Sequence, residues 1–225
     1  MKKLISILGA SFIWMVLIAP ANSGSIGAGV AFHVGDYSAT GTETEKVVTG
    51  PAEENNSTSV SEAFLGASVY AEYRTDNGWA VGIDYVPTDI ELGSGKRIDV
   101  STGADIAAAA DTGTRSASAE LDGLTTLYAH IPFGPVYVLL GYHHVDVTTT
   151  ETLPTTSYGD VTINGTQIGI GMKSEDSRIR VQASYSDFDD ISITGTGNTV
   201  AGQITGQSKV TADADALAFT VAIGF

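Results

Sequence analysis

The feature that most constrains this chain is a repeated alternation of apolar residues with small or polar ones at a period of two. Segments of about ten residues follow this pattern, which is typical of strands that present one face to lipid. The sequence predicts eight strands, over residues 25–35, 64–74, 79–86, 123–131, 136–147, 162–173, 178–188 and 209–225. We therefore expect an all-β protein.

The links between the predicted strands alternate between short and long. Three are short (75–78, 132–135 and 174–177), and the first contains Asn77-Gly78, a strong hairpin signal. Four are long (36–63, 87–122, 148–161 and 189–208) and rich in Thr, Gly, Ser and acidic residues. Short turns at one end and long loops at the other are typical of outer-membrane barrels. The sequence predicts an eight-stranded antiparallel up-and-down transmembrane β-barrel. A ten-stranded barrel, with 191–193 and 199–200 as an added hairpin, stays open.

The pattern of the residues before the first predicted strand indicates a cleavable secretory signal peptide. Lys2 and Lys3 precede an apolar run over 4–18, and Ala19-Pro20-Ala21 offers a small-residue cleavage site. The run is shorter than the roughly 20 residues that a spanning helix needs. We expect a signal peptide over 1–21, with Ser23 as the other cleavage point, and a barrel over 24–225. No later run is long enough for a spanning helix.

Composition narrows the function classes. Cleavage removes two of the eleven Lys and Arg residues and none of the 26 Asp and Glu residues. The resulting negative charge repels phosphate backbones, so no nucleic-acid partner is expected. The chain has no cysteine, which excludes disulfides and thiol chemistry.

The last predicted strand carries the most specific pattern. Its large apolar residues share one face and end the sequence: Leu217, Phe219, Val221, Ile223 and Phe225. Here the chain resembles the small bacterial outer-membrane β-barrel family, of OmpA-like and OmpX-like barrels, whose members commonly end on such an aromatic residue. The resemblance implies that this strand is the signal for the barrel-assembly machinery. It also implies a cell outer-membrane location, with membrane lipid and lipopolysaccharide as surroundings.

Further aromatic residues lie beside the predicted short turns. Tyr73, Trp79 and Phe133 would share the level of the C-terminal Phe225, where the periplasmic interface favours amphipathic rings. The opposite, inward faces carry charged or titratable residues: Glu72, Arg74, Asp84, Lys173, Arg178, Arg180, His33 and His130. An eight-stranded barrel is just wide enough for side chains to fill it, so these charges must pair. We predict a network in which Glu72 and Asp84 contact Arg178 or Arg180 and plug the lumen.

Catalytic and metal-binding patterns are weak. No histidine lies close in sequence to a serine in the manner of a hydrolase, and adjacent His143 and His144 would point to opposite faces of a strand. Acidic residues cluster toward the outer ends of the last two predicted strands: Asp187, Asp189, Asp190, Asp213 and Asp215. They form either a solvated acidic rim or a site for a divalent cation. The sequence favours a non-enzymatic structural or surface-interaction protein without cofactor or metal. A small-solute channel and a lipid A-modifying enzyme are the alternatives, and the extracellular ligand is not predicted.

Overall fold

The computed structural model describes residues 24–46, 53–99, 113–152, 156–176, 178–197 and 208–225. Within them the elements are twelve β-strands. Their bounds are β1 Gly24–Lys46, β2 Glu53–Thr75, β3 Ala80–Tyr85, β4 Ile90–Asp99, β5 Gly113–Phe133, β6 Val136–Thr152, β7 Thr156–Ser157, β8 Val161–Lys173, β9 Ile179–Phe188, β10 Ile191–Thr194, β11 Thr196–Gly197 and β12 Ser208–Gly224. The predicted signal peptide over 1–21 lies outside the described residues.

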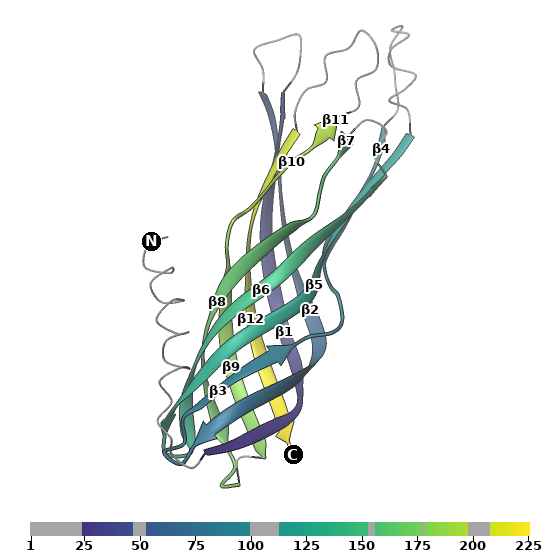
Figure 1. The fold of residues 1–225 in the computed structure, drawn as a ribbon. Coiled ribbons are helices and arrows are strands. Elements are labelled where there is room, and N and C mark those ends of the chain that lie inside the picture. Colours follow the sequence, from purple (N-terminus) through teal and green to yellow (C-terminus); the bar gives the residue numbers. More distant parts are fainter. Residues whose placement is uncertain (1–23, 47–52, 100–112, 153–155, 177, 198–207) are drawn as a thin grey trace, which may run out of the picture.

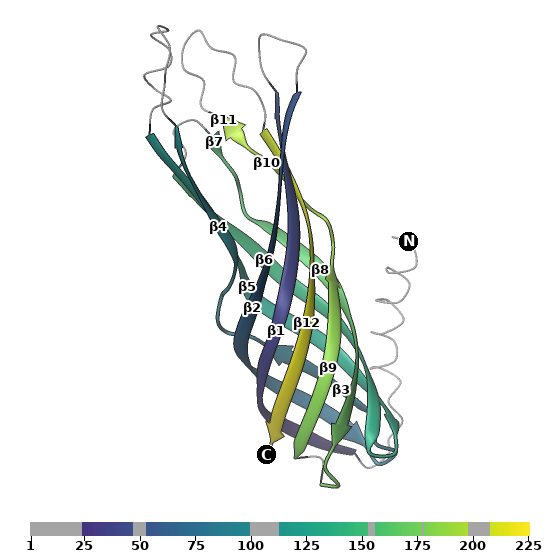
Figure 2. The same cartoon turned by 180° about the vertical axis from the view of Figure 1, so that it is seen from behind.

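Eight of these strands close into a ring. Antiparallel neighbours follow in the order β1, β2, β3, β5, β6, β8, β9 and β12, and β12 pairs back onto β1 from Gly29↔Gly224 outward. Figures 1 and 2 show the ring from opposite sides, with the short turns and the C-terminus at one end. The predicted eight-stranded antiparallel barrel is therefore confirmed. We call the end with the short turns periplasmic and the other end outer.

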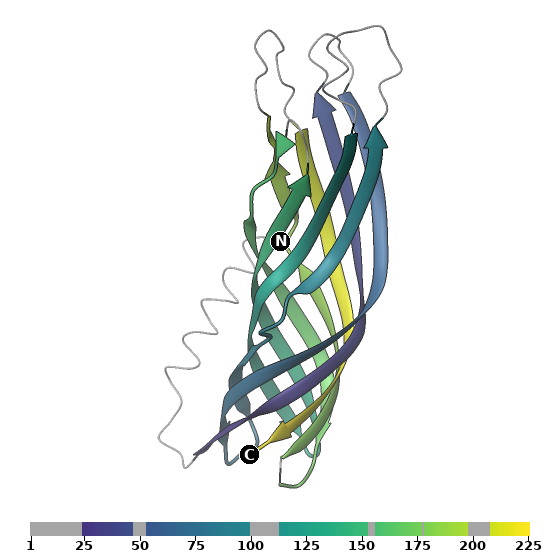
Figure 3. The same ribbon diagram turned by 90° about the vertical axis from the view of Figure 1, so that its right-hand side faces the viewer.

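The strands continue far beyond the predicted limits at the outer end, as Figure 3 shows from the side. The segments predicted as loops hold the outer parts of β1, β2 and β5, the whole of β4, and β10, which extends the pairing of β9 along β12. Their side chains are mostly Thr, Ser and acids, as in the Thr40–Ser59 hydrogen bond of 3.1 Å. Thr favours strands without needing an apolar face, so the period-two hydrophobic signal is absent there although the ladder persists.

The outer surface of the ring carries a belt of exposed large apolar side chains. On β12 this face runs from Leu217 (59% exposed) through Phe219 to Ile223, and Phe225 follows it. The eight steps from Leu217 to Phe225 correspond to about 21 Å along the axis at roughly 3.4 Å per step and a tilt near 40°, close to the ~25 Å apolar band of membrane barrels. Among the described residues, no helix is long and apolar enough to cross a membrane.

The inner face of the same strand is buried. Thr220 and Ala222 point into the lumen and are 3% and 0% exposed. Small residues leave room for tyrosine rings over the neighbouring strand: a Cβ at Gly82 would lie 2.5 Å from the ring of Tyr128, its partner in the register. The period of two thus separates a lipid-facing surface from a tightly filled interior.

Candidate functional site in the barrel lumen

The periplasmic half of the lumen is filled around one buried carboxylate. Glu72 of β2 accepts a hydrogen bond from Arg180 of β9, with 2.5 Å between Arg180 Nη1 and Glu72 Oε2. Tyr128 of β5 donates its hydroxyl to the same oxygen at 2.6 Å. Arg74 contacts the other carboxylate oxygen. The side chains of Glu72 and Arg180 are only 1% and 8% exposed, so this ion pair is withdrawn from solvent.

Aromatic rings surround this ion pair. The guanidinium of Arg180 lies 4.0 Å from the ring centre of Tyr70, and His130 stacks between Tyr128 and Tyr137 at 4.8 and 4.2 Å. Cation–π contact and ring stacking add to the charge pairing when the groups are desolvated. We call Glu72, Arg180, Tyr70, Tyr128, His130 and Tyr137 the lumen plug. All six residues are buried.

The structure brings together some of the predicted charge network. Glu72, Arg74, Arg180 and His130 meet in or beside the lumen plug. Lys173 is set apart at the periplasmic end, where its Nζ donates to the carbonyl of Gly78 at 3.1 Å.

Two other predicted members lie elsewhere. Asp84 accepts a hydrogen bond from Ser68 at 2.8 Å and, in the described part of the chain, forms no ion pair with either arginine. Arg178 lies at the periplasmic turn, 3.9 Å from Asp176, with a side chain that is 72% exposed. The predicted pairing of Asp84 with arginine, and the inward place of Arg178, are therefore wrong. β9 begins only at Ile179, so Arg178 belongs to the preceding turn and the inward alternation starts at Arg180.

Asp176 shows how this turn is stabilised. The hydroxyl of Ser174 and the main-chain N–H of Arg178 donate hydrogen bonds to Asp176, and in that order they lower the pKa of its carboxyl group. The group lies in the turn, outside the membrane-spanning part of the strands.

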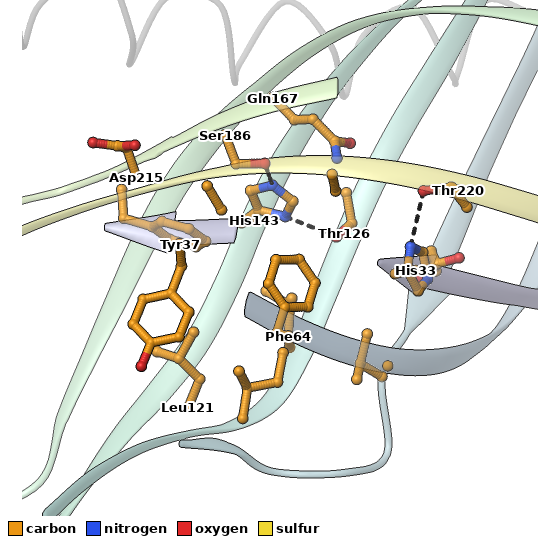
Figure 4. A pocket seen from close by; sticks show the side chains of 18 of the residues that line it. His33, Tyr37, Phe64, Leu121, Thr126, His143, Gln167, Ser186, Asp215 and Thr220 are labelled. Carbon is orange, nitrogen blue, oxygen red and sulfur yellow. Dashed lines mark hydrogen bonds between the residues drawn. The ribbon is translucent and has the colours of Figure 1, made fainter. Parts of the chain in front are cut away.

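The outer half of the lumen holds a cavity of about 100 Å³ that ends on the lumen plug. Apolar side chains form much of its wall: Phe64, Ile90, Leu92, Leu121, Leu124, Leu139, Ile163, Phe188 and Ile191. Several of them belong to a buried apolar cluster with Val145 and Val147. Figure 4 shows Phe64, Tyr37 and Leu121 projecting into this space. The lumen therefore divides into a polar inner half and a largely apolar outer half.

Two hydrogen-bonded chains run along the cavity wall. His143 contacts Thr126 through Nδ1 at 2.8 Å and Ser186 through Nε2 at 2.9 Å (Figure 4). His33 contacts Thr220 through Nδ1 at 3.0 Å and Ser68 through Nε2 at 2.8 Å. The sequence did not reveal these contacts, because their members lie on different strands and only the register brings them together.

The barrel wall has a seam beside this cavity. β2 pairs with β3 only from Val69 to Arg74, while β4 pairs with β5. Among the described residues, the outer part of β2 and the facing edge of β4 share no ladder. The two edges approach closely at one point, where a Cβ on Gly93 would lie 3.7 Å from Val60 Cγ2. Phe64 of β2 and Ile90 of β4 line the cavity on either side of this seam.

Comparison with known proteins shows the fold. No family model matches the chain, and no curated protein sequence matches it. The outer membrane protein AlkL, solved in lipid bilayers, is similar with a TM-score of 0.53 and 17% identity, covering 92% of this chain and 94% of that one. OprG from Pseudomonas aeruginosa gives 0.44 and 12%, covering 88% and 95%.

This chain has the fold of a small outer-membrane β-barrel. The narrower grouping with OmpA-like and OmpX-like barrels stays a prediction. The aromatic residues expected at the periplasmic interface lie at that end, and Trp79, Phe133 and Phe225 are 42%, 66% and 84% exposed. Tyr73 lies on β2, two residues from its end at Thr75.

The acidic residues predicted for the rim lie around the junction of β9 and β10: Asp187 ends the pairing of β9 with Asp215 of β12, Asp189 and Asp190 separate β9 from β10, and Asp213 lies within β12. The neighbouring carboxyl group of Asp190 raises the pKa of Asp213. No group of three or more potential metal ligands occurs within the described ranges. Adjacent His143 and His144 do face opposite sides: His143 is buried in the lumen, whereas His144 is exposed and contacts Asn164.

Proposed function

We propose that this chain is a non-enzymatic outer-membrane barrel that takes small apolar molecules from the cell surface into its outer lumen and releases them sideways into the membrane. The observation that carries the proposal is the position of the cavity. It ends on the lumen plug in one direction and borders the seam between β2 and β4 in another.

The lumen plug argues against passage straight through the barrel. An ion or polar solute would have to displace the Glu72–Arg180 pair and the rings stacked around it. Breaking a buried ion pair costs about 3–5 kcal/mol. This argument disfavours the small-solute channel and leaves the cavity with two exits, the outer mouth and the seam.

The cavity wall suits an apolar ligand of modest size. Its volume of about 100 Å³ is of the order of the ~150 Å³ apolar cavity that stays dry and binds benzene. Its apolar lining favours transfer from water at about 25 cal/mol per Å² of buried apolar surface. A molecule leaving through the seam would meet the apolar belt and its lipid, because the edges of β2 and β4 form part of the same wall.

The cellular setting is part of the proposal. The belt of exposed apolar side chains supports contact with outer-membrane lipid, and lipopolysaccharide would surround the outer ends of the strands. The exposed apolar face of β12 and Phe225 supports recognition by the barrel-assembly machinery. The signal-peptide pattern over 1–21 supports export.

Two variants, one single and one double, test the route. A Cβ at Gly66 meets nothing within 4 Å, so Gly66→Leu should fill the cavity without strain. Val60→Cys with Gly93→Cys is designed to close the seam as a disulfide, because a Cβ on Gly93 would lie 3.7 Å from Val60 Cγ2, the atom that a cysteine sulfur would replace, and the chain has no other cysteine. We expect both changes to slow toluene uptake by cells that express the full chain. The single Gly93→Cys variant is the control for backbone strain, since Gly93 has a φ of 142°.

Four outcomes would contradict the proposal. If Gly66→Leu leaves toluene uptake unchanged, the transported molecule does not pass through the cavity. If reducing the disulfide does not restore toluene uptake, closure of the seam is not the cause of the loss. Stable, reproducible single-channel steps in planar bilayers would show a continuous pore, and an altered lipid A acyl pattern in cells with the gene would show an enzyme.

A second candidate function is surface interaction. The β1–β2 hairpin extends more than ten residues past the apolar belt on each strand, whereas a spanning strand needs about 9–11 residues in all. Shortening this hairpin, with the barrel left whole, should abolish attachment to a surface partner and leave toluene uptake unchanged. Loss of uptake alone would favour the transport role.

A further inference from the structure

Asp84 and Thr126 form a cross-strand pair at the inner end of the cavity. They lie directly opposite each other in the register of β3 and β5, and both line the cavity. Directly opposed residues have Cβ atoms about 4.5–5.5 Å apart. A single polar atom in the cavity can therefore reach both side chains.

The hydrogen bonds around Asp84 all run in one direction. Ser68 has one hydroxyl hydrogen, which it donates to Asp84 Oδ2. Its bond with His33 Nε2 must therefore be donated by the imidazole, and Nδ1 must accept from Thr220. The chain ends on a carboxylate, which offers about four acceptor sites and uses one of them for Ser68. Asp84 can accept a hydrogen bond from a ligand.

Thr126 can supply the complementary hydrogen. A neutral imidazole carries one N–H, so His143 donates to one of its two hydroxyl partners and accepts from the other. When the proton is on Nδ1, Thr126 accepts from His143 and its own hydroxyl hydrogen is free. Asp84 and Thr126 then present an acceptor and a donor side by side.

The charges near this pair select a neutral ligand. The inner half of the lumen holds two arginines, Arg74 and Arg180, and two carboxylates, Glu72 and Asp84, so their charges sum to zero although, within the described residues, only Glu72 forms ion pairs with the arginines. Lys173 lies further toward the periplasm, where it donates to the carbonyl of Gly78. A charged ligand would bring an uncompensated charge beside them, which is costly in a buried site. A hydroxyl group both donates and accepts and carries no charge.

We propose that the ligand of the cavity is a neutral alcohol or phenol whose hydroxyl group donates to Asp84 and accepts from Thr126, with its apolar body toward Leu121 and Ile163. This inference rests on the proposed function, since it names the class of molecule that the same cavity takes. It assigns Asp84 and Thr126 as the residues that determine specificity.

The test compares phenol with toluene, which replaces the hydroxyl by a methyl group. The full mature chain is placed in lipid nanodiscs, and binding is followed through the methyl NMR signals of Leu121 and Ile163, at matched ligand concentrations in the lipid. The variants are Thr126→Val and Asp84→Asn. The matched controls are Thr162→Val and Asp146→Asn, because Asp146 and Thr162 also lie directly opposite each other on neighbouring strands but on the exposed surface, where Thr162 donates to Asp146 at 2.5 Å.

In the wild type, both compounds should shift the two methyl signals. Each lumen variant should weaken phenol binding about tenfold relative to toluene, as expected for loss of a hydrogen bond to a charged or buried partner. The control variants should leave that ratio unchanged. Should Asp84→Asn fail to fold, Thr126→Val still decides, since it leaves every buried charge in place.

The two proposals fail differently. A phenol-to-toluene ratio that is the same in the wild type and in Thr126→Val would overturn the hydroxyl site and leave an apolar ligand in the cavity. Tighter binding of benzoate or benzylamine than of phenol would overturn the choice of a neutral ligand. If the wild type binds neither phenol nor toluene, the proposed function itself is wrong.

Discussion

Replacing Glu72 by Gln should destabilise the barrel more than any other single charge change in its lumen. Gln keeps the shape of the side chain and can still accept from Tyr128 through its amide oxygen. It removes the one carboxylate that faces both Arg180 and Arg74. The consequence is a buried guanidinium with no counter-charge, held beside the ring of Tyr70.

The magnitude follows from burial. Removing one partner of a buried ion pair costs about 3–5 kcal/mol. Arg180 is 8% exposed and bears that cost almost fully, whereas Arg74 is 20% exposed and keeps some solvent. Because the Tyr128 hydrogen bond survives, we expect about 3 kcal/mol, at the low end of the range. With a urea slope of about 2 kcal/mol per M, the unfolding midpoint should fall by roughly 1.5 M.

The assay is urea unfolding of the barrel in lipid vesicles, followed by the heat-modifiable gel shift. Arg178→Gln is the matched control, since it breaks an ion pair of 3.9 Å whose side chains are 72% and 61% exposed; such surface pairs contribute about 0–1 kcal/mol. In Glu72→Gln with Arg180→Gln, no unpaired buried cation remains, so part of the stability should return. A Glu72→Gln midpoint equal to that of Arg178→Gln would refute the argument that this pair closes the lumen.

Three other predictions concern packing, assembly and pH. Gly82→Val should cost about 1–3 kcal/mol by overpacking, because its Cβ would lie 2.5 Å from the Tyr128 ring, whereas Gly66→Ala fills open space and should leave the urea midpoint unchanged. Phe225→Ser should lower the assembled fraction seen by gel shift in cells, and Phe225→Trp should not; equal assembly of both would argue against a terminal signal. The lowered pKa of Asp176 means that its stabilisation of the turn is complete above the ordinary pKa near 4 and is lost as the pH falls through the lowered value. NMR of the turn amides should show this loosening in the wild type and no such step in Asp176→Asn.

The lipid-facing half of the fold follows directly from the sequence. A period of two assigns Leu217, Phe219 and Ile223 to one face, and the structure exposes all three. The outer ladders could not be predicted in this way, because Thr and Ser continue a strand without an apolar face to mark it. The period-two apolar pattern therefore predicted the membrane-spanning parts of the strands but placed their outer ends too early.

The sequence predicted most of the charged residues that face the lumen, but it could not predict which of them pair. Glu72 and Arg180 are both inward on their strands, yet 108 positions separate them and only the register places one opposite the other. For the same reason, the hydrogen bond between His143 and Ser186 could not be predicted from the sequence. The apolar outer lumen did leave a signal: in 136–147 both faces are apolar, and the inward set includes Leu139 and Val145, each 1% exposed.

That second apolar face has a functional consequence. A barrel that only anchors loops could keep a polar or small-residue interior along its whole length, as the periplasmic half does here. Placing Leu121, Val145 and Ile163 inward above a buried ion pair makes the outer lumen resemble the lipid more than the water at its mouth. An apolar molecule in that space loses little by moving into the bilayer, and a large amount by crossing the lumen plug. Among the described residues the wall beside the cavity lacks a ladder between β2 and β4, so the proposed function predicts that the ligand leaves sideways through this seam.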